Sequence, residues 1–413
     1  MRYQDAQHIR TSKLGSPPLA APPAQSKVYA PPANIPFFRP VVSEDEIEAV
    51  TAVLRSGWLT TGVKAHEFEQ KFAAFLGDGV EAVAVNSATA GLHLAAEACG
   101  IGPGDEVLVP TLTFTATASV IRYLGAEVVL IDVDRKTRTI DLEDAARRIT
   151  PRCKAIIPVH FGGFPCDTAA VLDFARRHHL RVIEDAAHAL PAHRSGRPVG
   201  SWETDASVFS FYANKPITTG EGGMIVTRNP DIAARVRVMR THGLNRDAFD
   251  RFSKVGASWA YDVVSPGFKY NLTDVAAAIG VVQLGRANTL QSGRQRAAKR
   301  YLKRLTGLPL DCPTPAPSDS LHSWHLFPVR LHETARISRD DLIAALTAQG
   351  IGTSVHYRPL HQMTYWRQRY DFKPNEFPEA DRYFAGSVSL PLFPAMADEE
   401  VDRVADALQE LLE

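Results

Sequence analysis

The chain has few cysteines for its length, and their placement excludes two classes of protein. Its 413 residues contain only Cys99, Cys153, Cys166 and Cys312. Their spacing lacks the paired pattern of a zinc site, so no metal is expected. Four cysteines in so long a chain do not indicate a disulfide framework either. We therefore expect reduced thiols and a cytoplasmic protein.

The chain also lacks an excess of charge and any long apolar run. Lys and Arg together number 46, as do Asp and Glu. This balance provides no general field that would attract nucleic acid or an anionic membrane. No apolar run approaches the roughly 20 residues that cross a bilayer, and residues 1–23 lack the continuous apolar segment of a secretory signal. We expect neither a nucleic-acid partner nor a membrane partner.

What the chain does contain is typical of a globular enzyme. Hydrophobic residues make up 45% and charged residues 22%, and the length is sufficient for two lobes. Seven prolines between Pro17 and Pro36, without helical or strand periodicity, predict a flexible tail. The predicted division is a tail at 1–35, a large domain at 36–288 and a small C-terminal domain at 289–413.

Short apolar runs alternate with amphipathic patterns from residue 82 to residue 184. This alternation predicts βαβ units and a mainly parallel sheet, in which ligands lie at the carboxyl ends of the strands. The predicted strands are 82–85, 106–109, 127–131, 155–159 and 181–184, and the predicted helices are 90–99, 115–124 and 168–178.

A helix is predicted before this region and a smaller lobe after it. Ser43 and Glu46 match a capping box, and Gly57 ends the helix that they begin. The predicted apolar face of this helix consists of Ile47, Val50, Val53 and Leu54. A helical pattern from Thr273 leads through 291–305 into the C-terminal lobe. That lobe is predicted to contain a strand at 325–331, a helix at 338–349, a strand at 352–357 and a helix at 398–412, in an undetermined topology.

One lysine and one aspartate stand at strand ends. Lys215 interrupts an apolar segment between a strand-like run at 207–211 and a glycine-rich hairpin at 220–223, and Asp185 ends the apolar run RVIED. Burial would lower the pKa of the lysine and favour the neutral amine that attacks an aldehyde. A carboxylate keeps a pyridine nitrogen protonated, so this pair meets the needs of pyridoxal phosphate chemistry. By position alone, Asp185 fits a helix cap equally well.

From about residue 36 to its C-terminus, the sequence resembles the DegT/DnrJ/EryC1/StrS family of pyridoxal-phosphate-dependent sugar aminotransferases. Within the family it is most similar to the branch of UDP-4-amino-4-deoxy-L-arabinose:2-oxoglutarate aminotransferases. The resemblance is carried by nine blocks in order: SGWLTTG (56–62), NSATAGLHLA (86–95), PTLTFTATA (110–118), PVHFGGFPCD (158–167), VIEDAAHA (182–189), FSFYANKPITTGEGG (209–223), HGLNRDAFDR (242–251), SPGFKYNLTDVAAAIGVVQL (265–284) and LPLFPAM (390–396).

The resemblance implies an α/β protein with the fold type I architecture of aspartate aminotransferase. A large domain would hold a mainly parallel central sheet, beside a smaller C-terminal α/β domain. The implied cofactor is pyridoxal 5'-phosphate, with Lys215 as its covalent partner and proton carrier and Asp185 at its ring nitrogen. The other implied cofactor contacts are Thr89, Ala90 and Ser210 at the phosphate, Phe114 stacked on the ring and His188 near it.

The block GFKYNLTD differs from GYNYRL, the wider pattern of the family, and the resembled branch shares the difference. Lys269 replaces the Asn of that pattern and Asn271 replaces its Arg. In the family this loop reaches into the site of the neighbouring subunit. The resemblance therefore implies a homodimer with shared active sites, in which Lys269 completes the phosphate cradle. An exposed loop lysine is the alternative interpretation of Lys269.

The function implied by the resemblance is transfer of an amino group from L-glutamate to a nucleotide-linked 4-keto sugar, with release of 2-oxoglutarate. The product would be a 4-amino-4-deoxy sugar nucleotide for lipopolysaccharide, capsule or a glycosylated metabolite. Trp58, Thr60 and Thr61 match the motif that lines the sugar-nucleotide side. The alternatives are 3-amination, sugar dehydration, or a non-catalytic regulator that binds the cofactor. The sequence does not select the nucleotide, the sugar or a role for His356, Tyr357 or His361.

Overall fold

The computed structural model of the protein describes residues 34–245 and 260–413. The predicted tail lies outside the described residues up to position 33, and the sequence block at 242–251 lies outside them beyond residue 245. Within the two described ranges, no helix combines the length and the apolar character needed to cross a membrane.

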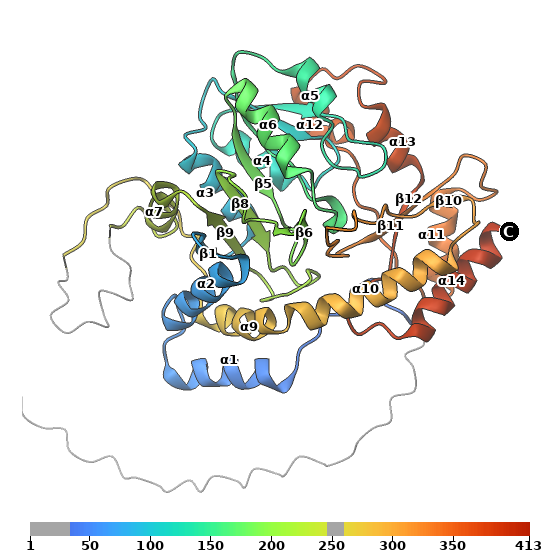
Figure 1. Cartoon of the computed structure of the whole chain (residues 1–413), viewed down its shortest axis with the longest axis horizontal. Coiled ribbons are helices and arrows are strands. Elements are labelled where there is room, and N and C mark those ends of the chain that lie inside the picture. The colour runs from blue at the N-terminus through green and yellow to red at the C-terminus, as the bar shows by residue number, and fades with distance from the viewer. Residues whose placement is uncertain (1–33, 246–259) are drawn as a thin grey trace, which may run out of the picture. The chain divides into compact units, whose positions relative to one another are not determined.

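A seven-stranded sheet occupies the centre of the large lobe (Figure 1). Its order is β1-β9-β8-β5-β4-β2-β3, and only β9 runs against its neighbours. Its strands are β1 (Glu81–Val85), β2 (Glu106–Pro110), β3 (Glu127–Ile131), β4 (Cys153–Ile156), β5 (Arg181–Asp185), β8 (Ala206–Ser210) and β9 (Gly223–Thr227). The expected mainly parallel sheet is thus confirmed, and each strand predicted between 82 and 184 has its counterpart.

Helices connect the consecutive strands from β1 to β5 and cover the sheet, which explains why its strands are apolar on both faces. Side-chain oxygens of Ser87, Asp141, Asp167 and Asn229 accept backbone N–H groups at the starts of α3, α5, α6 and α7. The helices are α2 (Val63–Leu76), α3 (Ala88–Ala98), α4 (Ala116–Tyr123), α5 (Leu142–Arg148), α6 (Thr168–His178) and α7 (Pro230–Met239), with a 3-10 turn at Phe161–Gly163 and a small hairpin of β6 (His193–Arg194) and β7 (Arg197–Pro198).

Helix α1 (Glu44–Ser56) begins and ends as predicted. The Ser43 backbone N–H donates to the Glu46 carboxylate across 2.7 Å, and Gly57 ends the helix with φ of 74°. The predicted apolar face is only partly correct, because Ile47 and Leu54 are 51% and 55% exposed. Buried Glu46 instead accepts a hydrogen bond from Gln283 on α9 (Asp274–Gly285) across 2.6 Å. The contact between α1 and α9 therefore includes a polar side chain, which the spacing of apolar residues does not predict.

The C-terminal lobe follows two helices, α9 (Asp274–Gly285) and α10 (Ala287–Arg304). It holds the antiparallel sheet β10 (Leu310–Asp311), β11 (Phe327–Leu331) and β12 (Ser387–Leu390), together with α11 (Arg339–Ala348), a 3-10 turn at Leu360–Gln362, α12 (Thr364–Arg369), α13 (Pro378–Gly386) and α14 (Asp398–Leu412). The predicted strand at 352–357 is wrong. Within that segment only Ser354 forms a bridge, to Ser389, and the bridge of the preceding residue Ile351 goes to a different partner, Ile35, so no continuous ladder develops.

The described residues form four apolar clusters. Three of them pack against the central sheet, and the fourth lies between α10, β11, β12 and α14 in the C-terminal lobe. Trp366, Phe377 and Tyr383, from the C-terminal part of the sequence, pack into the core around the central sheet. The division at residue 288 stays a prediction.

Candidate active site

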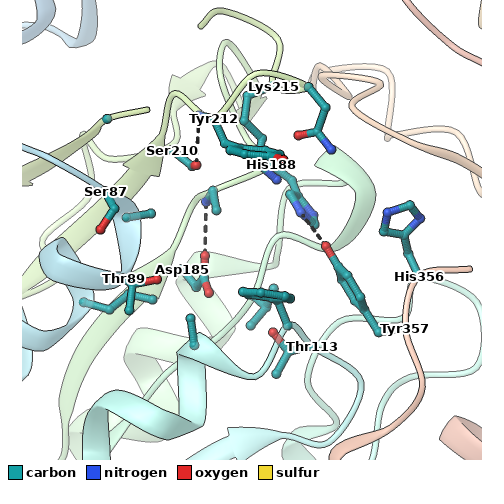
Figure 2. Close-up of a pocket in the computed structure, with 18 of the residues that line it drawn as sticks. Ser87, Thr89, Thr113, Asp185, His188, Ser210, Tyr212, Lys215, His356 and Tyr357 are labelled. Carbon is teal, nitrogen blue, oxygen red and sulfur yellow. Dashed lines mark hydrogen bonds between the residues drawn. The ribbon is translucent and has the colours of Figure 1, made fainter. Parts of the chain in front are cut away.

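A cavity of about 340 Å³ lies at the carboxyl edge of the central sheet (Figure 2). Parallel α/β sheets bind ligands at this edge, because their strands deliver side chains there from several elements. Strands β1, β2, β5 and β8 all end beside the cavity. The predicted site residues that line it are Thr89, Phe114, Asp185, His188, Ser210 and Lys215.

Lys215 reaches the cavity from the loop between β8 and β9. Its backbone N–H donates to the Tyr212 carbonyl across 2.9 Å, and its Nζ lies 3.3 Å from Nε2 of His325. Burial lowers the pKa of the amine to about 8, an effect that Arg294 strengthens and Asp185 opposes. A lysine in this environment supplies neutral amine near neutral pH far more readily than an exposed one.

Asp185 is the last residue of β5 and is 6% exposed. Its Oδ2 accepts a hydrogen bond from Thr117 Oγ1 across 2.8 Å, and its Oδ1 accepts the backbone N–H of Ala187 across 3.1 Å. Burial raises the pKa of this carboxyl, while Thr117, Ala187 and the charge of Lys215 act against the rise. A dry carboxylate with two fixed donors is suited to a cationic ligand atom, such as a protonated pyridine nitrogen.

His188 has a defined tautomer. Its Nδ1 accepts the backbone N–H of Gly162 across 3.2 Å, and its Nε2 lies 3.1 Å from the hydroxyl oxygen of Tyr357. Burial holds the pKa of His188 well below 6.5, so the ring is neutral. Because Nδ1 is an acceptor, the proton is on Nε2 and is donated to Tyr357.

Small residues and a helix start form the opposite end of the cavity from Tyr357 (Figure 2). Ser87 caps α3 by accepting the Ala90 N–H across 3.1 Å, and Ser210 adds a second hydroxyl. A side chain on Gly223 would lie 2.7 Å from the backbone at Ser87, so β9 can approach this turn only with glycine there. Hydroxyl groups at a helix N-terminus suit an anionic group such as a phosphate.

The other predicted site residues do not line the cavity of the single chain. Ala90 is buried behind the α3 start. Thr61, a predicted substrate residue, instead contacts the loop that was expected to reach the neighbouring subunit. Asn271 Nδ2 of that loop donates to Thr61 Oγ1 across 2.6 Å, and Lys269 Nζ donates to Asn271 Oδ1 across 2.6 Å. The Trp58 ring N–H donates to the Thr61 carbonyl across 3.1 Å, while the Thr60 carbonyl accepts the N–H of Asp274.

Three residues beside this site were missed by the sequence analysis. Thr117 holds Asp185, while His325 and Arg294 lie beside Lys215. Thr117 falls inside the block PTLTFTATA but has no local pattern that marks it. His325 and Arg294 are separated from Lys215 by 110 and 79 residues in the sequence, so only the fold brings them to it.

The cavity fits pyridoxal phosphate at three points. Lys215 offers an amine for the aldehyde, Asp185 a carboxylate for the ring nitrogen, and the Ser87 turn a place for the phosphate. Phe114 and Tyr212 add aromatic rings to the wall. The arrangement therefore combines a nucleophile, an ion partner and an anion site around one space of cofactor size.

Comparisons with known proteins agree with this chemistry. SpsC of Bacillus subtilis, a spore coat polysaccharide biosynthesis protein, is 43% identical over 380 residues, which cover 92% of this chain and 97% of SpsC. Spr1654 of Streptococcus pneumoniae, a proposed sugar aminotransferase solved in its PLP form, superimposes with a TM-score of 0.84 at 32% identity, covering 92% of this chain and 100% of that one. PseC of Helicobacter pylori, an aminotransferase of pseudoaminic acid biosynthesis, gives a TM-score of 0.84 at 28% identity, covering 92% and 99%.

The family model gives the same result over nearly the whole folded part. Residues 40–409 match the model of the DegT/DnrJ/EryC1/StrS aminotransferase family. With the relatives above and a cavity suited to pyridoxal phosphate, the chain belongs to this family of pyridoxal-phosphate-dependent sugar aminotransferases.

Proposed function

We propose that the protein transfers an amino group from L-glutamate to C4 of a nucleotide-linked 4-keto sugar. One observation carries the proposal: Lys215 and Asp185 line the same cavity, and burial lowers the pKa of the Lys215 amine, which favours the neutral base. The presence of Lys215 favours transamination over dehydration, since transamination needs a base at this position. A regulator that only binds the cofactor would not need a buried amine.

Pyridoxal phosphate, when bound, supplies an electron sink for the α-carbon of the amino acid. Lys215 is proposed to take the α-proton of glutamate and to deliver a proton during release of 2-oxoglutarate. Asp185 keeps the ring nitrogen protonated. His188 stays neutral and donates through Nε2, so it orients a neighbouring oxygen without adding charge. The same residues then work in the reverse direction with the keto sugar.

We propose that the sites are completed by a second copy of the chain. Among the described residues that line the cavity, Lys215 is the only lysine or arginine. A phosphate dianion beside the Ser87 turn therefore lacks a cation from its own chain, and Lys269 of a second copy would supply it. Exposed apolar side chains support such an interface, since Ile47 and Leu54 lie two turns apart on α1 and Phe114 at the cavity is 57% exposed.

We also propose a cytoplasmic location, on the basis of the cysteines. The four cysteines are free thiols, and Cys99 and Cys166 are buried. Unpaired cysteines are usual in a reducing compartment.

Glutamate is expected to convert the bound cofactor from its aldehyde form to its amine form. The measurement is the cofactor absorption spectrum of the purified protein, together with assay of 2-oxoglutarate. Adding a panel of nucleotide-linked 4-keto and 3-keto sugars to the amine form should then restore the aldehyde form with the 4-keto compounds. An unchanged spectrum with glutamate would reject the donor, and faster reaction with 3-keto sugars would reject amination at C4.

Mixed dimers test the contribution of Lys269. Lys269→Ala should weaken cofactor binding by roughly 1.5–3 kcal/mol, the typical net value of a hydrogen bond to a charged group. Combining Lys269→Ala chains with Lys215→Ala chains should restore turnover, because one site of each mixed dimer then has both lysines. If Lys269 acts within its own chain, every site of the mixed dimer remains defective and turnover is not restored.

A further inference from the structure

We infer that His325 is a positioning residue for the amine of Lys215, a proposal that rests on the proposed role of Lys215. Nε2 of His325 lies 3.3 Å from Nζ of Lys215, and the His325 side chain is 3% exposed. Lys215 lines the cavity, whereas His325 is not among the described lining residues. His325 therefore contacts Lys215 from outside the cavity and affects the reaction only through Lys215.

The backbone around His325 is fixed by contacts with the 3-10 turn beside β5. The N–H groups of Ser323 and Leu326 donate to the carbonyls of Gly163 and Gly162 across 3.0 and 3.1 Å. A side chain on Gly163 would approach the His325 backbone nitrogen to 3.1 Å, and Gly163 has φ of 99°. Glycine at this position allows the close approach that holds His325 in place.

A buried arginine fixes the same segment from the other side. Nη1 of Arg294, on α10, donates to the carbonyls of Trp324 and His325 across 3.3 Å and to that of Leu392 across 3.0 Å. Arg294 is 3% exposed. Since both sides of the His325 backbone are held, the ring has little freedom to follow Lys215 if the lysine moves.

A neutral imidazole is well suited to hold this amine. Burial lowers the pKa of His325 well below 6.5, and Lys215, His188, Arg294 and His356 lower it further. The neutral ring can accept a hydrogen bond from an ammonium group or donate one to a free amine. It therefore keeps Nζ in place in both protonation states, whereas a carboxylate would favour the ammonium form and weaken the base.

Two amide variants of different length test the proposal. The amide of Gln extends to the position of Nε2, while that of Asn extends only to Nδ1, so His325→Gln keeps the contact with Lys215 and His325→Asn loses it. We expect His325→Asn to slow the single-turnover reaction of the holoenzyme with glutamate by about 10²-fold, the typical cost of a misplaced catalytic group. His325→Gln should stay within about tenfold of the wild type. Glutamate affinity should not change in either variant.

A second measurement follows the reactivity of the Lys215 amine in the cofactor-free protein. The pH dependence of labelling of Lys215 by an amine-specific reagent, read by mass spectrometry of its peptide, should give a pKa of about 8 in the cofactor-free wild type. His325→Asn should alter this profile and His325→Gln should preserve it. His322→Gln is the structural control, because His322 is buried in the same segment but contacts Trp324. It is expected to leave the profile of Lys215 unchanged.

The outcomes separate the two proposals. Borohydride reduction of the holoenzyme, followed by peptide mapping, identifies the lysine bound to the cofactor. Attachment at another lysine would overturn the roles of both Lys215 and His325. Attachment at Lys215 with equal rates and labelling profiles for His325→Asn and the wild type would overturn the role of His325 alone. The role of His325 would also be overturned if His325→Asn reacted slowly but had an unaltered labelling profile. The same conclusion would follow if His325→Gln reacted as slowly as His325→Asn.

Discussion

Replacing Lys215 by alanine is expected to abolish transamination while the protein keeps its fold. The variant lacks the side chain that we propose both binds the cofactor covalently and moves the α-proton. Proton transfer by a positioned side chain alone contributes up to about 10⁴-fold to a rate, so we expect at least that loss. The fold should persist, because the burial of Lys215 is unfavourable for a charge. Single-turnover absorption with glutamate measures the rate.

Two further substitutions make this expectation specific. Lys215→Arg keeps a positive charge but provides no amine of suitable pKa, so it should be as inactive as the alanine variant. Lys71→Ala removes an exposed lysine that pairs with Glu67 on α2, and it should react as the wild type does. Normal turnover of Lys215→Ala, with cofactor bound, would overturn the assignment of this residue.

The central fold follows from local sequence patterns, whereas Thr89 and Phe114 were implied by the family resemblance. The apolar runs that end at Val85, Pro110 and Asp185 predict parallel strands, and such strands end at one edge of a sheet. Side chains placed just after those runs are therefore expected to meet, and the structure places Thr89, Phe114 and Asp185 at one cavity. Lys215 was predictable because a charged residue inside an apolar strand-to-hairpin segment is unusual.

Features that depend on tertiary contacts did not follow from the sequence. Thr117 and His325 act on Asp185 and Lys215 across 68 and 110 residues of sequence, so no local pattern marks them. The segment 352–357 has the composition of a strand, but the positions of its neighbours allow only one isolated bridge, at Ser354. On α1, Ile47 is exposed although its spacing is that of a core residue. Periodicity reports an apolar face without identifying what covers it.

Asp185→Asn is expected to weaken cofactor binding strongly. The substitution keeps the shape of the side chain but removes the charge that we propose holds the proton of the pyridine nitrogen. Removing one partner of a buried ion pair typically costs about 3–5 kcal/mol, or between about 10²- and 10⁴-fold in affinity. Titration of the cofactor-free protein with pyridoxal phosphate measures the dissociation constant. Thr117→Val should cause a smaller loss in the same direction, because it removes one hydrogen bond to the carboxylate.

The same substitution is expected to stabilise the cofactor-free protein. Burial raises the pKa of Asp185 above its usual value, so the folded state binds this proton more tightly than the unfolded state does. At pH values above both pKa values the carboxyl is ionised in either state, and its burial then lowers the free energy of unfolding. Asparagine removes that cost, so the thermal midpoint of the cofactor-free variant at pH 7 should exceed that of the wild type. The difference should shrink as the pH falls toward the usual aspartate pKa.

An Asp185→Asn variant that binds pyridoxal phosphate as tightly as the wild type would show that Asp185 is not the partner of the ring nitrogen. A lower midpoint at pH 7 would show that the carboxylate is stabilised by its hydrogen bonds to Thr117 and Ala187 more than it is penalised by burial.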